Sequence, residues 1–408
     1  MRALGLAALL GLSTAAFAQD WPQWGGVSRD FHVATKGLAA TWPEGGPKRL
    51  WSRPLGEGHS AILAAGGVLY TMYGTGTDDV VVALDAATGR TLWEQRSSAA
   101  HDKMDFEYGK GPHSTPLLSG DRLFAVGTTG KLHALDPKTG KVLWSHDLWS
   151  EYHGSFEDRG YAPSPIAYKD LVILQVGGKG QALMAFRQAD GSVAWKQHDF
   201  MTSPSSPVLI QLGGKDQLVA FLGDRIAGLD PAGGGLLWSY PHATQWGLNI
   251  STPVWGADRI LLCSSAYNGG TRALKLVPGD GGTTAGELWF NNKIRVHHGN
   301  VVRLGDLAVG SSGDFGPAFL AGFDVHSGEI LWQERGFSKA TLLEAEGRLL
   351  ILDEDGRLTL ASASRTGLKV LAQAPLLSRT AWTVPTLSGT KLYLRDRKQI
   401  LAVELGAS

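Results

Sequence analysis

The stretch ALDAATGRTLW at residues 83–93 decides the fold, because copies of it recur along the chain. ALDPKTGKVLW follows at 134–144, and weaker copies are AFRQADGSVAW at 185–195, GLDPAGGGLLW at 228–238 and GFDVHSGEILW at 322–332. Each copy has a Gly at its seventh position and a Trp at its eleventh. Alternating apolar residues around a turn that needs a positive-φ Gly predict a strand, a tight turn and a second strand.

The Trp residues at the ends of these units allow the units to be counted along the chain. They lie 42 to 51 residues apart and are Trp51, Trp93, Trp144, Trp195, Trp238, Trp289 and Trp332. A period of this length, with about four short strands in each unit, is typical of a β-propeller. We interpret these Trp residues as structural, with rings that fill the gaps between neighbouring blades.

Two incomplete units predict how the ring closes. A degenerate unit runs from about 341 to 373, where Gly367 keeps the turn and Leu371 replaces the Trp, and the last unit, 380–405, has no closing strand. PKRLWSRPL at 47–55 is a closing strand without a repeat before it. We therefore predict an all-β, eight-bladed propeller of four-stranded antiparallel blades, in which the N-terminal strand completes the last blade. Such closure removes exposed sheet edges. Seven blades are the fallback if the degenerate unit is misread.

The start of the chain predicts export. Residues 1–18 combine a basic start, an apolar run and an A-x-A site, which is the pattern of a cleavable signal peptide. No Cys follows it to carry a lipid, and we expect no transmembrane segment after its removal. We expect three parts: a signal peptide at 1–18, a strap rich in aromatic, Pro and Gly residues at 19–47, and one propeller domain at 48–408. The predicted location is the periplasm or the exterior.

Charge and Cys content narrow the class of partner. The chain carries 38 Lys and Arg against 38 Asp and Glu, so no basic face indicates nucleic acid. Cys263 is the only Cys, so an exported chain cannot form a disulfide within itself. Its apolar strand context, ILLCSSA, favours a buried, unreactive thiol. We expect a monomer.

The units at 83–93 and 134–144 resemble the PQQ-binding-like β-propeller repeat family, and DWPQWGG at 20–26 resembles the start of an exported bacterial subgroup of it. The family includes quinoprotein alcohol dehydrogenases and the scaffold lipoprotein of the outer-membrane β-barrel assembly machinery. The resemblance implies PQQ with calcium if the chain is an enzyme. The adjacent-Cys disulfide of those dehydrogenases cannot form here, and no Asp or Glu is assigned by motif to the base or calcium roles.

Loops that lead into the innermost strands hold the candidate binding residues. In a propeller these loops gather on one face around the axis, here called the loop face. Aromatic rings there could stack a flat ligand or a sugar, and Lys or Arg could meet an anionic group. The candidates are Tyr108, Lys110, His113, Tyr161, Trp246, Arg295, His298 and Trp382. The other reading is that these loops only plug the channel.

A metal site is not predicted. His59, His113 and His298 occupy similar places before their blades, but no H-x-H or H-E-x-x-H spacing supports coordination. His297 and His298, as neighbours on a strand, should also point in opposite directions. We predict no catalytic residue and no cofactor.

Three functions remain open from the sequence. The first is a non-enzymatic exported propeller that binds a protein or polymer of the cell envelope through the loop face, as a scaffold. The second is a PQQ-dependent alcohol or sugar dehydrogenase with an atypical site. The third is carbohydrate binding, in which Trp246 or Trp382 would stack a sugar ring.

Overall fold

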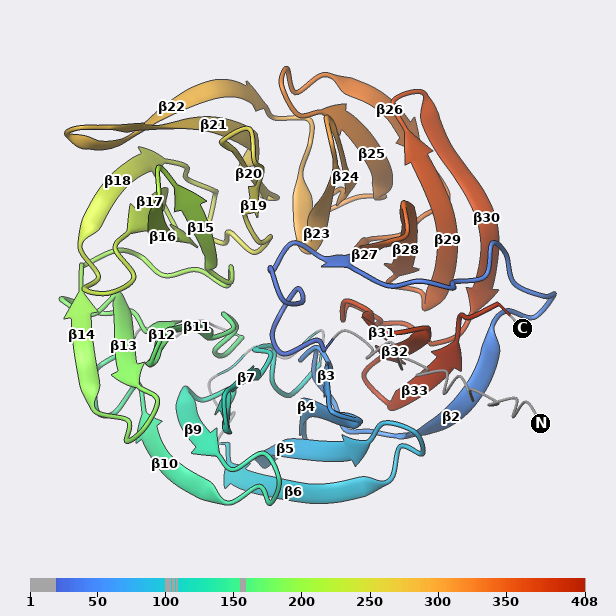
Figure 1. The fold of residues 1–408 in the computed structure, drawn as a ribbon, viewed down its shortest axis with the longest axis horizontal. Coiled ribbons are helices and arrows are strands. Elements are labelled where there is room, and N and C mark those ends of the chain that lie inside the picture. The colour runs from blue at the N-terminus through green and yellow to red at the C-terminus, as the bar shows by residue number, and fades with distance from the viewer. Residues whose placement is uncertain (1–19, 100–103, 105–106, 108, 155–158, 408) are drawn as a thin grey trace, which may run out of the picture.

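Eight blades of four antiparallel strands stand around a central axis in an eight-bladed β-propeller, and the sheet of blade 7 gains β1 (His32–Val33) as a fifth, parallel strand (Figure 1). The computed structural model describes residues 20–99, 104, 107, 109–154 and 159–407. The predicted signal peptide and Tyr108 therefore lie outside the described residues. The described part of the chain contains strands and no helix, and so no helix long and apolar enough to cross a membrane.

Within each of the first seven blades the strands run outward from the axis in sequence order. Blades 1 to 4 comprise β3 (Leu63–Ala65), β4 (Val68–Gly74), β5 (Asp78–Asp85), β6 (Thr91–Ser98); β7 (Leu117–Ser119), β8 (Arg122–Val126), β9 (Lys131–Leu135), β10 (Val142–Asp147); β11 (Ile166–Tyr168), β12 (Leu171–Gln175), β13 (Leu183–Arg187), β14 (Val193–Gln197); and β15 (Val208–Leu212), β16 (Lys215–Phe221), β17 (Arg225–Leu229), β18 (Leu236–Pro241).

Blades 5 to 8 repeat this order until the ring closes. They comprise β19 (Val254–Trp255), β20 (Ile260–Ser265), β21 (Gly270–Gly279), β22 (Gly282–Asn291); β23 (Val296–Leu304), β24 (Leu307–Ser312), β25 (Phe319–Asp324), β26 (Ile330–Glu334); β27 (Ala340–Ala345), β28 (Arg348–Asp353), β29 (Arg357–Ser364), β30 (Gly367–Pro375); and β31 (Thr386–Ser388), β32 (Lys391–Arg395), β33 (Gln399–Glu404), β2 (Lys48–Pro54).

The predicted closure is confirmed in blade 8, where the N-terminal strand β2 pairs antiparallel with β33. Arg395, at the end of β32, connects blade 8 to blade 1 by hydrogen bonds. Its buried guanidinium donates to the carbonyl oxygens of Met72 at 2.6 Å and Ser60 at 3.1 Å. The degenerate seventh unit forms a full blade, so the chain has eight blades and not seven.

Six of the seven repeat Trp residues donate a hydrogen bond to the next blade. The indole of Trp93 in blade 1 donates from Nε1 to the Pro137 carbonyl of blade 2 at 2.9 Å and lies against Gly140 in the same turn. Gly140 has φ of +73°, so its turn needs Gly both for the backbone and for the approach of the ring. Five further Trp residues donate in the same way, to Ala86, Gln188, Pro231, Val325 and Ser364 from Trp51, Trp144, Trp195, Trp289 and Trp332.

Trp238 differs because the next blade lacks the repeat turn. Blade 5 joins its outer strands β21 and β22 by a long hairpin that ends at Gly279 and Gly282. The Trp238 indole instead donates to Gln217 Oε1 of its own blade at 2.7 Å.

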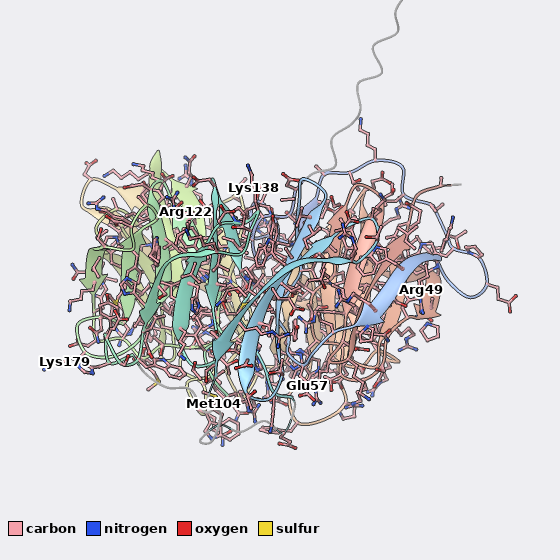
Figure 2. The ribbon with its side chains drawn as sticks, turned by 90° about the horizontal axis from the view of Figure 1, so that it is seen from below. Arg49, Glu57, Met104, Arg122, Lys138 and Lys179 are labelled. Carbon is pink, nitrogen blue, oxygen red and sulfur yellow. The ribbon has the colours of Figure 1, made fainter. Side chains whose placement is uncertain are left out.

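The two faces of the ring differ in what they carry (Figure 2). Arg122 and Lys138, in tight hairpin turns, lie at one edge, and Glu57, Met104 and Lys179 lie at the opposite edge. The second edge is the loop face, and we call the first the turn face.

Residues 20–47 cross the turn face and reach the centre of the ring (Figure 1). The short strand β1 (His32–Val33) runs parallel to β27, and Trp21 bridges Ala64. Phe31 has no exposed surface, and its ring meets Trp24 edge to face at 5.6 Å between centroids.

Arg29 fills the axis of the ring. Its Nη1 donates to the Pro207 carbonyl at 2.8 Å, its Nη2 to the Pro165 carbonyl, and its Nε to Gln23 Oε1 at 2.9 Å. Pro165 and Pro207 directly precede the innermost strands β11 and β15. The segment therefore closes the channel from the turn face.

Candidate functional site

Five rings from four blades meet at the loop-face end of the channel. Trp382 packs against His59 at 5.0 Å and His298 at 4.3 Å between ring centroids. His113 lies 5.2 Å from His59, and His297 lies 5.2 Å from His298. We call these five side chains the mouth cluster.

Burial keeps the imidazoles of His113, His297 and His298 neutral. Desolvation, with the positive charge of Arg159 nearby, lowers the pKa of His113 to about 4, and desolvation, with Lys339, lowers that of His297 to about 3. The pKa of His298 is held well below its ordinary value by burial first and then by His297. At neutral pH each ring therefore has one N–H donor and one acceptor nitrogen.

The expectation that His297 and His298 point in opposite directions is wrong. Their ring centroids lie only 5.2 Å apart, so the two side chains lie on the same side. The cause is an irregularity in β23: Val296 pairs with Ser312 and Val301 with Gly310, so the chain between the two pairs bulges out of register. Strict alternation of side chains does not hold across that bulge.

An apolar patch continues from the mouth cluster toward solvent. The Tyr267 hydroxyl lies 2.6 Å from His297 Nε2, and its ring packs against Trp246 at 4.8 Å and Phe315 at 5.4 Å. Met201 lies close to Gly247, next to Trp246. We define the apolar patch as Met201, Trp246, Tyr267 and Phe315. Phe315 is 74% exposed, Met201 58% and Trp246 52%, the three largest values among the large hydrophobic side chains of the described chain.

Sequence reasoning missed three members of this patch. Tyr267 lies in the loop between β20 and β21, and Phe315 lies in the loop between β24 and β25. Both loops reach the same face as the loops that lead into the innermost strands. The sequence-based candidates come only from the latter loops. Met201 precedes β15 in such a loop, but an isolated Met carries no recognisable signal.

The structure brings His113, His298, Trp246 and Trp382 of the predicted set into the mouth cluster and the patch, and it uses the others elsewhere. The Tyr161 hydroxyl donates to the Gln175 carbonyl at 2.9 Å inside the core. Arg295 pairs with Asp314 at 3.4 Å. Lys110 is exposed, and its backbone N–H donates to Glu57 Oε2 at 2.7 Å.

The donors at the mouth do not fit PQQ with calcium. Among the described residues no group of three or more His, Cys, Asp and Glu side chains could hold a metal ion. One carboxylate beside the rings is that of Glu354, which accepts from Trp382 Nε1 at 2.9 Å and from Arg379 at 3.2 Å. A second, Asp314, acts on His297 and pairs with Arg295 at 3.4 Å. Calcium needs six to eight oxygen ligands, and these two engaged carboxylates of the described residues do not supply them.

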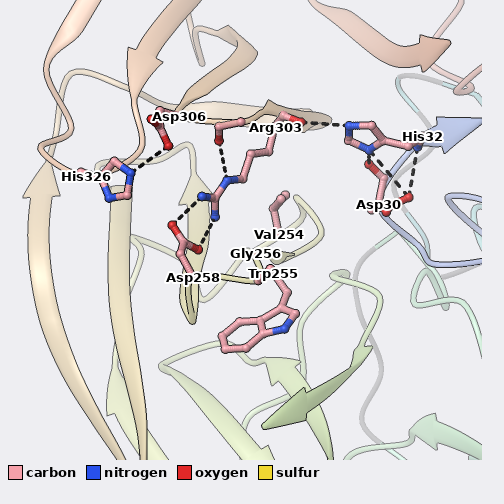
Figure 3. Close-up of a pocket in the computed structure, with 11 residues that line it drawn as sticks. Asp30, His32, Val254, Trp255, Gly256, Asp258, Arg303, Asp306 and His326 are labelled. Carbon is pink, nitrogen blue, oxygen red and sulfur yellow. Dashed lines mark hydrogen bonds and ion pairs between the residues drawn. The ribbon is translucent and has the colours of Figure 1, made fainter. Parts of the chain in front are cut away.

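A second cavity, of about 410 Å³, opens on the turn face between residues 30–32 and blades 5 and 6 (Figure 3). Arg303 makes a bidentate pair with Asp258 at 2.9 and 2.6 Å, and its guanidinium lies over Gly256, where a Cβ would collide with it. His32 Nε2 contacts the Arg303 carbonyl at 2.9 Å. His326 pairs with Asp306 at 2.9 Å. These contacts hold residues 30–32 against the blades, so we do not assign the cavity a ligand.

Sequence comparison identifies relatives over most of the chain. The family model described as "Outer membrane protein assembly factor BamB" matches residues 77–334. Outer membrane protein assembly factor BamB of Yersinia pestis is 24% identical over 312 residues, which are 71% of this chain and 73% of that protein. Quinohemoprotein alcohol dehydrogenase ADH IIB of Pseudomonas putida is 30% identical over 147 residues, which are 35% of this chain but 20% of the enzyme.

Solved structures agree with the fold. BamB from Moraxella catarrhalis superimposes with a TM-score of 0.63 at 16% identity, covering 88% of this chain and 99% of that one. The quinohemoprotein alcohol dehydrogenase from Comamonas testosteroni gives a TM-score of 0.67 at 13% identity, covering 96% and 81%. At these identities the likeness concerns the propeller alone.

Proposed function

The chain belongs to the outer membrane protein assembly factor BamB family of PQQ-like repeat propellers, and from that premise we propose that it is a non-enzymatic assembly scaffold of the cell envelope. We propose further that it works in the periplasm and binds a protein partner through the apolar patch on the loop face. The name of the relatives supports a role in outer-membrane protein assembly. The exposed apolar side chains support the loop face as the binding surface.

The observation that carries the proposal is the grouping of exposed apolar side chains. Met201, Trp246 and Phe315 come from blades 4, 5 and 6 and lie around Tyr267. Soluble monomers rarely expose neighbouring large apolar side chains, and such patches mark protein interaction sites. Trp and Tyr are also enriched among the residues that dominate binding energy, and a Met adapts its shape to a partner.

Two features favour this proposal over a quinoprotein dehydrogenase. Among the described residues no group of three or more side chains at the mouth could hold a metal ion, and Arg29 is buried against the carbonyls that precede β11 and β15. Trp382 is committed to its contacts with two imidazoles and Glu354, so among the predicted sugar-stacking rings Trp246 alone is open to solvent.

The test is genetic complementation with matched apolar variants. The gene is deleted in the bacterium that encodes it and restored as wild type, as a patch variant with Met201, Trp246 and Phe315 all changed to Ser, or as a control. The control changes Leu92, Leu143 and Leu237, three exposed residues of outer strands, to Ser. The readout is the amount of folded outer-membrane β-barrel protein, together with the level of the propeller itself.

We expect the wild type and the control to restore those levels, and the patch variant to fail although it accumulates normally. Full restoration by the patch variant would remove the patch from the proposal. No change on deletion would remove the assembly role. A one-to-one rise in melting temperature on adding PQQ with calcium to the purified protein would instead favour the dehydrogenase.

A further inference from the structure

We propose that the mouth cluster is a binding site for a single organic carboxylate with a flat or apolar body. The site lies deeper than the apolar patch, and it does not depend on the function proposed above. It rests on buried nitrogen atoms that lack partners, on an unpaired Lys beside them, and on walls made of ring faces.

The first observation is the set of nitrogens without partners. Nδ1 and Nε2 of His298 and Nδ1 of His297 are buried, and none has a hydrogen-bond partner among the described residues. A buried polar group without a partner costs about 1–3 kcal/mol, so such groups in a native protein indicate a missing water or ligand.

The contact with Tyr267 indicates which nitrogens can donate. When the Tyr267 hydroxyl donates to His297 Nε2, across 2.6 Å, the ring proton of neutral His297 must lie on Nδ1. Neutral His298 also has one N–H. The two neighbouring rings, 5.2 Å apart between centroids, then offer two N–H donors without partners, and a carboxylate has two oxygens that can accept.

The second observation is a positive charge without an ion pair. Lys339 precedes β27, and its ammonium group forms no salt bridge within the described part of the chain. Its carbonyl accepts from the backbone N–H of Glu354 at 2.7 Å, and Glu354 in turn binds Trp382. Gly299, next to His298, packs against the carbonyl of Ala340, next to Lys339. Lys339 acts on both His297 and His298, and at His297 Arg159 acts in the same sense while Asp314 opposes them, so two positive charges and one negative charge bear on an anion there.

The third observation is the shape and chemistry of the walls. The rings of His59 and His113 lie beside the stacked pair of Trp382 and His298, so the surroundings of the donors are aromatic. A flat or apolar body suits these ring faces. A metal ion does not, because no described group of three ligands converges.

The test is binding of 3-phenylpropanoate to the purified full propeller, measured by calorimetry beside its neutral amide, 3-phenylpropanamide. We expect the acid to bind at least tenfold more tightly than the amide. His298→Phe keeps a ring against Trp382 and removes both nitrogens, and Lys339→Met removes the charge. Each should weaken binding of the acid at least tenfold, whereas Lys138→Met on the turn face should not. If His298→Phe fails to fold, Lys339→Met alone carries the test.

A second arm identifies the source of the carboxylate. The tripeptide Gly-Gly-Leu with a free C-terminus is compared with its C-terminal amide. Tighter binding of the free tripeptide than of 3-phenylpropanoate, with the same dependence on Lys339, indicates a chain terminus, and the reverse indicates a small acid. Equal binding of each acid and its amide, no binding of either acid, or wild-type affinity in Lys339→Met overturns the proposal.

Discussion

Replacing Gly140 with Ala is expected to weaken the contact between blades 1 and 2. Gly140 has φ of +73°, and a Cβ there would lie 2.5 Å from the indole of Trp93. Gly120 is the matched control, because its φ is +58° and a Cβ there would meet nothing within 4 Å. The two substitutions share the backbone cost and differ in the contact with the ring.

The expected magnitudes follow from those two terms. An Ala in the left-handed region costs about 1–2 kcal/mol, so Gly120→Ala should lower the free energy of unfolding by that amount. Gly140→Ala adds an overpacking cost of about 1–3 kcal/mol, because the ring is fixed by its hydrogen bond to Pro137.

A double-mutant cycle isolates the ring contact. In a Trp93→Ala background the clash is absent, so Gly140→Ala should cost no more than Gly120→Ala does in the wild type. Urea unfolding followed by far-UV circular dichroism measures the four proteins of the cycle and the Gly120→Ala control without relying on Trp fluorescence. If Gly140→Ala and Gly120→Ala cost the same in the wild type, or the cycle gives no coupling energy, the account of blade docking is wrong.

Three further predictions concern buried groups. Arg29→Met should destabilise the fold by about 3–5 kcal/mol in urea unfolding, since it leaves the carbonyls of Pro165 and Pro207 buried and unpaired; a variant as stable as the wild type would contradict the role of this segment in closing the channel. Cys263 should resist thiol reagents at neutral pH until the protein unfolds, because burial raises the pKa of its thiol; stoichiometric labelling of the native protein would argue against that burial. Burial lowers the pKa of His113 from about 6.5 in the unfolded chain to about 4 in the folded chain, so the unfolded chain binds more protons at this residue. The stability that neutral His113 contributes should therefore be lost as the pH falls from about 6.5 to about 4. His113→Gln should reduce the fall in urea midpoint between pH 7 and pH 5, and an unchanged fall would refute the assignment.

The fold could be predicted because each blade carries the same local signal. The turn Gly shapes the hairpin of its own unit, and the Trp four places after it contacts the neighbouring unit. A single sequence therefore repeats the signal for blade-to-blade contact several times. The closure by β2 followed from counting strands, since one unit lacked an outer strand and one outer strand lacked a unit. Leu371 in place of the Trp did not prevent blade 7 from forming, because its strands still pair along their whole length.

The site was less predictable because it depends on contacts between distant loops. His113, His298 and Trp382 could be named from their places before the innermost strands, but their stacking depends on how three loops pack together. Tyr267 and Phe315 lie in loops between the second and third strands, where the sequence shows no repeat. The bulge in β23 that turns His297 and His298 to the same side has no local signature, and neither has the path that takes Arg29 to the axis.

The most direct test of the proposed scaffold is crosslinking from the apolar patch in living cells. p-Benzoylphenylalanine is placed at position 315, or at position 370 on the outer strand of blade 7 as an exposed control. The account predicts a light-dependent adduct from position 315 that contains one defined protein of the outer-membrane assembly pathway, and no such adduct from position 370. No adduct from position 315, or the same adduct from both positions, would contradict it.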